Sequence, residues 1–373
     1  MRIALVTTTF TIGGAEKQVS DLASEFSMQG HRVLIVSLKG QTQQSIPDDV
    51  ELVELHGKKS VVGLMSVLWR LARLLNRWNP DVVHGHMVVA NIISRIASIG
   101  SRSAVVVSSA HSVDEGGSRH RLRGYRLTDW LADMTTNASQ HAVDSYLRLK
   151  ASTAGKICVA GNGIDFGRYK FSGSDRMRLR AEFGLTADVP LCLAVGRLVP
   201  AKDYPNLIEA FAQVVRLLPH AKLFVVGAGP LADSLKQRIE KLGIANSIQL
   251  LGMRTDIAEL MSAADLFVLS SAWEGAPLVT IEALACQLPI IATDCGGVSD
   301  NLNGFGCLVP VGNSAALAEA IIEELKCKRT KMDPTLIEGR RSALERFSLE
   351  SVSKRWLSLY KRLYVEKYGS EIQ

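Results

Sequence analysis

The sequence predicts an α/β protein of two domains, each built around a parallel β-sheet. The chain has 373 residues, which exceeds one ordinary compact domain and suggests two. Short apolar runs recur along it, and each is followed by a longer segment with helical periodicity, as is typical of βα units. Hydrophobic residues make up 47% and charged residues 21%, without a low-complexity tract, so disordered and fibrous classes are excluded.

The βα units form two series, one in each half of the chain. The strands expected in the first half are Arg2–Thr7, Val33–Ser37, Val82–His84, Ala104–Ser109 and Ile157–Ala160. Those expected in the second half are Leu191–Val195, Lys222–Val226, Ile248–Leu251, Leu266–Leu269 and Ile290–Thr293. Polar residues and Gly173 interrupt the pattern between Phe166 and Ser174, so we expect a linker there, with domains 1–168 and 169–348.

A last helix is expected over about residues 349–366. Its apolar face carries Trp356, Leu357, Tyr360 and Leu363. Such a helix either packs back on the first domain or caps the second.

Composition also bears on the compartment. The six cysteines form no Cys-x-x-Cys pair and have no histidine partners at metal-ligand spacing, which predicts reduced thiols. Thr7–Thr9 interrupt the first apolar run, so we expect a strand rather than a signal peptide, and no run approaches the length of a transmembrane helix. We expect a cytoplasmic protein, at most peripheral at the inner face of the cytoplasmic membrane. The net charge of +6 comes without a nucleic-acid-binding motif.

The first strand is followed by Gly13 and Gly14 at the expected start of a helix. Glycines permit backbone conformations that side chains forbid, and amides at a helix start can face an anion. An ordinary turn is the alternative. The GxGxxG fingerprint is absent, which argues against an NAD enzyme.

The second half opens with a candidate phosphate-binding loop. Gly196 and Arg197 end a strand, and Lys202 precedes a helix expected to start near residue 203 or 204. Two cations at the carboxyl end of a parallel strand suit a diphosphate, since each charge-assisted contact contributes about 1.5–3 kcal/mol. A solvated loop with two surface cations is the alternative.

Two glutamates eight positions apart form the most informative segment. Gly275 and Pro277 follow Glu274, and a helix-forming run surrounds Glu282. A helix starting near Pro277 would leave amides free to bind an anion in a cleft. These amides belong to Ala276, Leu278 and Val279. Glu274 could then reach a donor-sugar hydroxyl and Glu282 the ribose hydroxyls. The apolar neighbours of Glu282 make an unpaired carboxylate costly.

At this point the chain resembles the family-4 retaining glycosyltransferases of GT-B fold, on motifs that occur in the same order. They are Gly13-Gly14-Ala15-Glu16, Asn162-Gly163-Ile164-Asp165, Gly196-Arg197-Leu198 with Lys202, Val226-Gly227 with Gly229-Pro230, Glu274 through Ala283, and Gly296-Gly297. The family often has glutamate where this chain has Asp300, which leaves the contact of that loop open. The resemblance implies two Rossmann-like domains facing each other across a cleft.

The resemblance also implies the chemistry. A nucleotide sugar would be the donor, with UDP the commonest nucleotide in relatives and GDP left open. His111 would face the donor sugar near its 6-hydroxyl, while Asn162 and Gly229 would belong to the substrate site. Transfer would retain the anomeric configuration, a diphosphate oxygen taking the acceptor's proton.

No Asp-x-Asp triplet occurs in the sequence, so no metal and no other cofactor is expected. Arg197, Lys202 and the helix amides would instead stabilise the departing diphosphate. With His111 and Glu274, the two cations make up the expected catalytic set.

Basic and apolar residues alternate in a stretch without acidic residues between Gly57 and Pro80. Its cations are Lys58, Lys59, Arg70, Arg73 and Arg77, and its large apolar residues are Leu64, Leu68, Trp69, Leu71, Leu75 and Trp78. A second basic run holds Arg119, Arg121, Arg123 and Arg126. Together they suggest contact with an anionic membrane beside an undecaprenyl-diphosphate-linked sugar acceptor, as in polysaccharide or O-antigen synthesis. A plain amphipathic helix packed on its sheet is the alternative.

Other functional classes share the same motifs. A hydrolase or epimerase of this architecture would turn over the nucleotide sugar without an acceptor. A sucrose-synthase-like enzyme would use a soluble acceptor and would not need the basic surface. A non-catalytic protein would bind the nucleotide sugar without transferring it.

Overall fold

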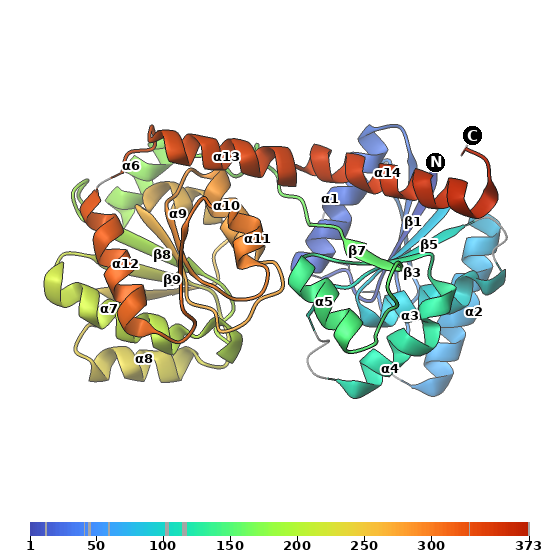
Figure 1. Cartoon of the computed structure of the whole chain (residues 1–373), viewed down its shortest axis with the longest axis horizontal. Coiled ribbons are helices and arrows are strands. Elements are labelled where there is room, and N and C mark those ends of the chain that lie inside the picture. The colour runs from blue at the N-terminus through green and yellow to red at the C-terminus, as the bar shows by residue number, and fades with distance from the viewer. Residues whose placement is uncertain are drawn as a thin grey trace. The chain divides into compact units, whose positions relative to one another are not determined.

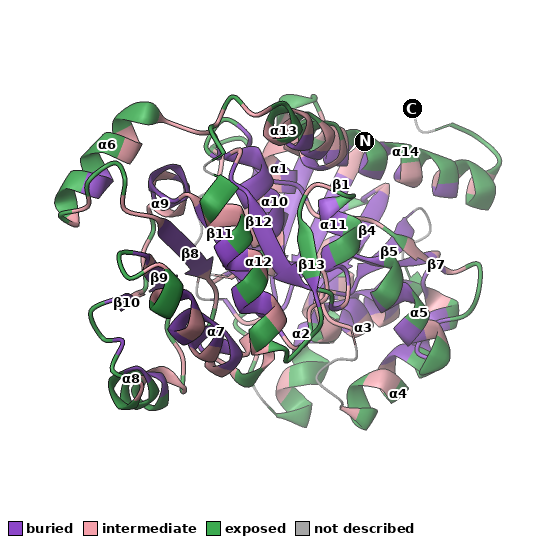
Figure 2. Ribbon diagram, turned by 60° about the vertical axis from the view of Figure 1, so that its left-hand side comes forward, coloured by how far each residue is buried: buried purple, intermediate pink, exposed green. Residues whose placement is uncertain are grey.

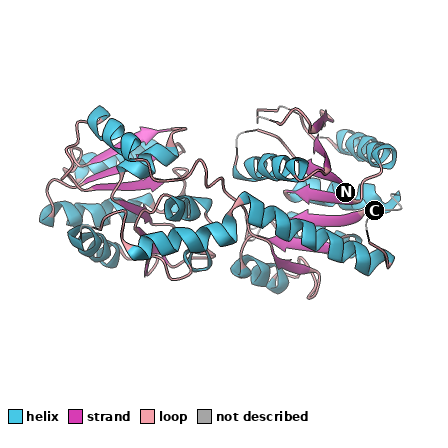
Figure 3. Ribbon diagram, turned by 90° about the horizontal axis from the view of Figure 1, so that it is seen from above, coloured by secondary structure: helices cyan, strands magenta, loops and turns pink. Residues whose placement is uncertain are grey.

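The computed structural model describes residues 1–11, 13–40, 42–43, 46–58, 60–100, 104–113, 118–327 and 329–371 (Figure 1). The chain forms two compact units: unit 1 comprises Met1–Gly163 with Leu349–Gln373, and unit 2 comprises Ile164–Ser348. In each unit, helices cover both faces of one parallel sheet (Figure 3). Both units are therefore Rossmann-like α/β domains, as the sequence predicts.

Unit 1 contains a seven-stranded sheet in the order β3-β2-β1-β4-β5-β6-β7. Its elements are β1 (Arg2–Thr7), α1 (Gly14–Met28), β2 (Arg32–Ser37), β3 (Glu51–Glu54), α2 (Val61–Trp78), β4 (Val82–His86), α3 (Val88–Ala97), β5 (Val105–Ser109), α4 (Arg119–Thr128), β6 (Met134–Asn137), α5 (Gln140–Arg148), β7 (Ile157–Val159) and α14 (Leu349–Tyr368). Because side chains alternate along a strand, Ile3 and Leu5 enter one apolar cluster while Ala4 and Val6 enter the cluster on the opposite face.

Unit 2 contains a six-stranded sheet in the order β10-β9-β8-β11-β12-β13. Its elements are α6 (Gly173–Glu182), β8 (Leu191–Val195), α7 (Tyr204–Leu217), β9 (Lys222–Val226), α8 (Ala232–Lys241), β10 (Ile248–Gly252), α9 (Ile257–Ala263), β11 (Leu266–Leu269), α10 (Leu278–Ala285), β12 (Ile290–Thr293), α11 (Val298–Leu302), β13 (Cys307–Val309), α12 (Ser314–Cys327) and α13 (Pro334–Phe347). Its four central strands, β9, β8, β11 and β12, are almost entirely buried, as parallel strands covered on both faces must be (Figure 2).

The strands predicted in both halves are confirmed, and three further strands were missed. β3 carries a glutamate at each end and lies at a sheet edge. β13 spans only three residues. β6 has no apolar run, because its buried threonines are held by hydrogen bonds instead; the hydroxyl of Thr135, for example, accepts from the guanidinium of buried Arg95 at 2.7 Å.

The C-terminal helix α14 packs on unit 1. Trp356, Tyr360 and Leu363 are at most 4% exposed and join the apolar cluster formed by β1 and α1. The Tyr360 hydroxyl lies 2.6 Å from Nδ1 of His84 on β4, and the amide of Gln29 donates to the Ser353 hydroxyl at 2.8 Å. The helix is therefore a structural part of unit 1, although unit 2 separates it from the rest of that unit in the sequence.

The segment expected to link the two domains lies inside unit 2. Phe166 and Tyr169 are buried in its core, and Gly173 begins α6. The expectation of a polar linker at 166–174 was wrong because these two aromatic side chains, spaced three residues apart, pack in the core beside α10 and α13. The polar residues around them hid this apolar pattern in the sequence. The chain passes between the units at Gly163/Ile164 and again at Ser348/Leu349.

We predict that Tyr360→Ala lowers the free energy of unfolding by about 3–5 kcal/mol, because it empties a fully buried aromatic site and removes the partner of His84. The measurement is urea denaturation followed by tryptophan fluorescence, which reports mainly on unit 1 since it holds Trp69, Trp78, Trp130 and Trp356.

The matched control is Val365→Ala on the same helix, where the side chain is 43% exposed. Its effect should stay within about 0.5 kcal/mol. Equal effects of the two substitutions would contradict the packing of α14.

Candidate functional site

The predicted phosphate-binding residues of unit 2 lie at the switch point of its sheet. β8 and β11 are neighbours, but β9 follows β8 on one side and β12 follows β11 on the other. Loops after such strands diverge, and the crevice between them is where open α/β sheets bind ligands. The loop after β8 carries Arg197 and Lys202, and the loop after β11 carries Glu274.

Lys202 and Glu274, 72 positions apart in sequence, form an ion pair across this switch point. Only 17% of the Lys202 side chain and 13% of the Glu274 side chain are exposed. Both Lys202 and the hydroxyl of Ser271 donate to Oε1 of Glu274, the latter at 2.7 Å. In the described parts of the chain Oε2 of Glu274 has no hydrogen-bond donor, so it can accept one from a sugar hydroxyl.

The two loops are also joined through their backbones. The amide of Ala272 donates to the carbonyl of Ala201 at 2.9 Å, and the Ser270 hydroxyl donates to the carbonyl of Lys202 at 2.9 Å. A Cβ atom on Gly296, whose φ is 54°, would collide with the carbonyl of Glu274. The glycine turn after β12 therefore packs directly against the Glu274 loop and fixes its position.

Arg197 is exposed at the start of the same loop, and no acceptor is bonded to its side chain among the residues with described positions. The preceding Gly196 accepts a hydrogen bond from the Tyr204 hydroxyl at 3.1 Å. Gly229 approaches the backbone of Leu198 so closely that a Cβ would collide with it. Gly229 thus has a packing role that the sequence did not reveal, and its contact with substrate stays a prediction.

The expected helix start after Glu274 is confirmed: α10 begins at Leu278, with Pro277 as its N-cap. The hydroxyl of Thr280 and the amide of Asn301 both donate to the Pro277 carbonyl, at 2.8 and 3.0 Å. No described acceptor is bonded to the amides of Leu278 and Val279, or to that of Ala276 before them. The positive end of the α10 dipole is therefore open to an anion. Gly275, in contrast, uses its carbonyl to accept from the Gly297 amide at 2.9 Å.

Glu282 lies half-buried one turn into α10, and its partner is Tyr169. Burial is the main reason that the pKa of Tyr169 is raised well above its ordinary value, and the charge of Glu282 and the hydrogen bond to it raise it further. No described contact joins Glu282 to Arg197 or Lys202. Sequence reasoning missed Tyr169, because nothing in a spacing of more than a hundred residues indicates this contact. The hydrogen bond from the ribose to Glu282 stays a prediction.

In unit 1 the predicted residues Gly13 and Gly14 follow β1, next to the switch between β1 and β4. Gly13 is the N-cap of α1, and a Cβ there would collide with the carboxylate of Glu16. That carboxylate accepts from the Thr9 hydroxyl at 2.9 Å and is buried. It would repel an incoming phosphate, so the start of α1 is less suited to an anion than the start of α10.

His111 and Asn162 lie at the same carboxyl edge of the sheet of unit 1, after β5 and β7 respectively. Both are half-buried. Burial lowers the pKa of His111 to about 4, so its ring is neutral at pH 7. A neutral imidazole offers one hydrogen-bond donor and one acceptor, which suits a sugar hydroxyl better than a diphosphate.

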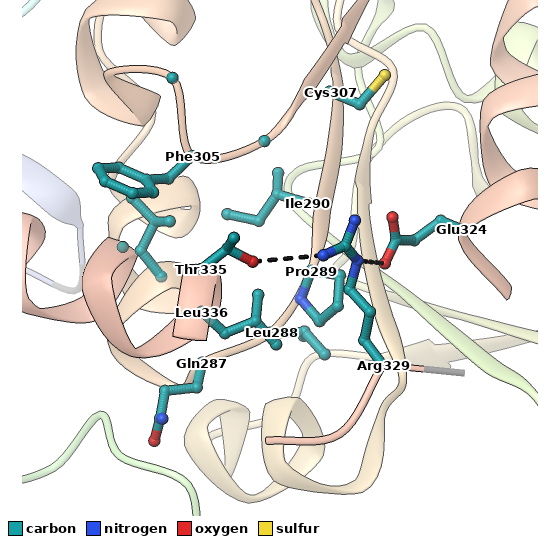
Figure 4. Close-up of a pocket in the computed structure, with 14 residues that line it drawn as sticks. Gln287, Leu288, Pro289, Ile290, Phe305, Cys307, Glu324, Arg329, Thr335 and Leu336 are labelled. Atoms are coloured by element: carbon teal, nitrogen blue, oxygen red, sulfur yellow. Dashed lines mark hydrogen bonds and ion pairs between the residues drawn. The ribbon is translucent and has the colours of Figure 1, made fainter. Parts of the chain in front are cut away.

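A separate cavity of about 360 Å³ lies at the opposite, amino-terminal edge of the sheet of unit 2 (Figure 4). Pro289 and Ile290 at the start of β12 line it together with Phe305. Its two charged lining residues form an ion pair, with Nε of Arg329 lying 2.7 Å from Oε1 of Glu324. None of the predicted site residues lines this cavity, so the predicted donor site lies elsewhere.

Among the described helices, none is both long and apolar enough to cross a bilayer.

Comparison with known proteins identifies the family. Residues 12–168 match the family described as Glycosyltransferase Family 4, and residues 175–341 match Glycosyl transferases group 1. The chain is 29% identical over 354 residues to the lipopolysaccharide core biosynthesis glycosyltransferase LpsE of Rhizobium meliloti, covering 93% of this chain and 95% of LpsE. It is 30% identical over 261 residues to the UDP-Gal:alpha-D-GlcNAc-diphosphoundecaprenol alpha-1,3-galactosyltransferase of Escherichia coli, covering 67% of this chain and 65% of that enzyme.

The fold is shared with a solved structure. Anabaena HepE, crystallised in complex with UDP, matches with a TM-score of 0.82 at 26% identity, covering 96% of this chain and 99% of HepE. The family matches, the relatives and the fold agree with one another and with the site geometry: the chain belongs to the family-4 glycosyltransferases of GT-B fold.

Proposed function

We propose that the enzyme transfers a hexose or N-acetylhexosamine from a UDP-sugar to a sugar carried on a lipid diphosphate, in polysaccharide or lipopolysaccharide synthesis, with retention of the anomeric configuration. HepE has been crystallised with UDP and with UDP-glucose, which supports the donor nucleotide. The name of the Escherichia coli relative supports the acceptor class. The observation that carries the proposal is the Lys202–Glu274 pair at the switch point of unit 2.

In this proposal the leaving diphosphate is stabilised by positive charge alone. Lys202 and Arg197 supply two cations, and the open amides at the start of α10 supply the positive end of a helix dipole. Charge that develops on the diphosphate in the transition state strengthens all three interactions, so they accelerate transfer rather than only tighten binding. No metal ion is required for this role.

The sugar is held by uncharged or paired groups. Oε2 of Glu274 accepts a hydrogen bond from a sugar hydroxyl, while Oε1 keeps Lys202 and Ser271 in place. The neutral ring of His111 contacts another hydroxyl. In this proposal the cations contact the leaving group, while the Glu274 carboxylate and the neutral His111 ring contact the sugar.

The proposed activity can be tested with a panel of UDP-glucose, UDP-galactose, UDP-N-acetylglucosamine and GDP-mannose, each offered with GlcNAc-diphosphoundecaprenol in buffer containing EDTA. Product masses from mass spectrometry should show one added sugar with at least one UDP donor. In the same assay Lys202→Ala and Arg197→Ala should each lower kcat by at least about 10²-fold, because each removes charge that stabilises the leaving group.

The matched control is Lys236→Ala, which removes an exposed cation of α8 in the same unit and should leave kcat unchanged. Wild-type kcat in Lys202→Ala would refute the role of the ion pair. Transfer that needs added manganese would refute the metal-free mechanism, and release of free sugar with no acceptor product would indicate a hydrolase.

Glu282 is expected to bind the ribose of the donor, so Glu282→Ala should raise the Kd for UDP by about tenfold, the equivalent of roughly 1.4 kcal/mol. Tyr169→Phe separates this role from a structural one, because it removes only the hydroxyl that Glu282 accepts from. Isothermal titration with UDP measures both. An unchanged Kd in Glu282→Ala would remove Glu282 from the nucleotide site.

The acceptor proposal rests on an exposed surface of α2 and α4, two helices that both contact α3. On α2 the apolar side chains of Val61, Val62, Met65 and Trp69 are 60–80% exposed, and the Arg73 guanidinium lies 5.3 Å from the centre of the Trp69 ring. On α4 and just after it, Leu127 and Trp130 are more than 70% exposed beside the arginines of that helix. Exposed apolar groups among cations are typical of a surface that binds anionic membranes.

This surface includes fewer residues of the 58–78 stretch than the sequence suggested. Leu71, Leu75 and Trp78 lie in the core beneath α2 and cannot reach a membrane, whereas Leu64 and Trp69 face outward. One face of α2 packs on the sheet and the other is exposed, so packing of this helix is compatible with the proposed membrane contact. Lys59 lies outside the described residues.

We predict that the enzyme binds phosphatidylglycerol vesicles and that Arg70→Ala and Arg73→Ala each weaken binding about fivefold, which corresponds to about 1 kcal/mol per cation near an anionic surface. Co-sedimentation measures this binding, with phosphatidylcholine vesicles for comparison. Met177→Ala, at a side chain of unit 2 that is 72% exposed, serves as the control. Equal binding to both kinds of vesicle would contradict an electrostatic membrane contact.

A further inference from the structure

Three histidines lie together at the carboxyl edge of the sheet of unit 1, and the proposed function uses only one of them. His84 and His86 end β4, and His111 follows β5. His84 is anchored at both ring nitrogens: Nδ1 lies 2.6 Å from the Tyr360 hydroxyl and Nε2 lies 2.7 Å from the Ser109 hydroxyl. This histidine is completely buried and therefore fixed.

His86 is packed against that anchor. Its ring centre lies 4.0 Å from that of His84, and His84 in turn lies 4.5 Å from the ring of Trp356 on α14. Only 1% of His86 is exposed. On its other side, His86 Nδ1 lies 3.2 Å from Nε2 of His111, with the rings inclined by only 22°. The orientation of His111 thus depends on a ring that cannot move.

The hydrogen bond between His86 and His111 contains a single proton. Burial lowers the pKa of all three histidines, to about 3 for His84 and about 4 for His111, so each ring is neutral at pH 7. A neutral imidazole carries one N–H. Either His86 donates from Nδ1 to Nε2 of His111, or His111 donates from Nε2 to Nδ1 of His86.

The remaining nitrogen of His86 decides between these cases. Its Nε2 is buried and has no hydrogen-bond partner in the parts of the chain with described positions. Unpaired buried N–H groups are rarer than under-satisfied acceptors, so the proton belongs on Nδ1, where it has a partner. His111 then accepts at Nε2 and carries its own proton on Nδ1.

We propose that His86 is a positioning residue for sugar transfer: it donates from Nδ1 to Nε2 of His111 and so holds His111 in the tautomer that presents Nδ1–H to an oxygen of the donor sugar. This inference rests on the proposed contact between His111 and the donor. It assigns His111 the role of a hydrogen-bond donor rather than a base. It also gives α14 a function, because Tyr360 and Trp356 fix the ring that supports His86.

The tautomers can be read directly in the full-length protein labelled with ¹⁵N-histidine. Long-range ¹H–¹⁵N correlations distinguish Nδ1–H from Nε2–H rings, and signals are assigned by their loss in His86→Asn and His111→Ala. We expect His86 and His111 both to be Nδ1–H. A spectrum in which His111 is Nε2–H would overturn the proposal without reference to activity.

Kinetics test the consequence, with the donor that gives turnover in the panel above. His86→Leu should lower kcat by about 10- to 100-fold, the order expected when a reacting group is displaced, while KM for the donor changes by less than about threefold. His86→Asn keeps an N–H donor close to the position of Nδ1 and should recover most of kcat. His86→Gln places its amide farther out, near Nε2, and should not.

The Asn and Gln variants are equally polar, so a difference between them cannot come from burying a polar group. His220→Leu, at an exposed site in unit 2, controls for loss of a histidine elsewhere. Wild-type kcat in His86→Leu, or equal kcat in the Asn and Gln variants, would overturn the positioning role.

Failure of the proposed function gives a different pattern. If His111→Ala retains wild-type kcat while the spectrum shows Nδ1–H on His111, the donor contact of His111 is wrong, and the role of His86 in transfer falls with it. If His111→Ala loses activity while His111 is Nε2–H, the donor contact stands and only the inference about His86 is overturned.

Discussion

The candidate site of unit 2 is organised around one ion pair, that between Lys202 and Glu274. Placing two charges where less than a fifth of either side chain is exposed costs desolvation free energy, and the pair is stable only if its geometry is fixed from several sides. The chain supplies that support through Ser271, through the backbone bond between Ala272 and Ala201, and through the glycine turn at Gly296. The backbone bond joins the loop after β8 to the loop after β11, and the other two contacts hold the Glu274 loop in place. Lys202 and the Glu274 carboxylate are therefore held together before any substrate arrives.

The fold was largely predictable from the sequence because most of its strands are buried on both faces. Such strands read as short, continuous apolar runs, and those runs locate β8, β9 and β11 to the residue. A strand without an apolar run leaves no such pattern in the sequence. β6 is stabilised by hydrogen bonds from buried Arg95 to Thr135 and between the hydroxyls of Ser109 and Thr136, and these depend on residues that only the folded sheet brings together.

The candidate site was predictable to the extent that its residues lie in local motifs. Lys202 precedes a helix and Glu274 follows a strand, so the sheet topology alone brings them near each other. Residues that contact the site residues from distant segments of the chain have no such local motif. Tyr169 contacts Glu282 from a segment that was predicted to be a linker, and His86 lies two residues beyond the strand predicted at Val82–His84. Glu16 near the start of α1 could be seen in the sequence. The sequence did not show that its carboxylate folds back against Gly13, where it would repel a phosphate.

The order of the chain also bears on biosynthesis. Unit 2 is one continuous segment, so all of it has been synthesised once residue 348 has been added. Its two ends are joined by a hydrogen bond, which the amide of Ile164 donates to the carbonyl of Phe347 at 2.9 Å. Unit 1 begins first on the ribosome but lacks part of its apolar core until α14 emerges. The domain translated first is thus the last to be completed, and until then the face of its sheet that α14 covers stays open to solvent and to chaperones.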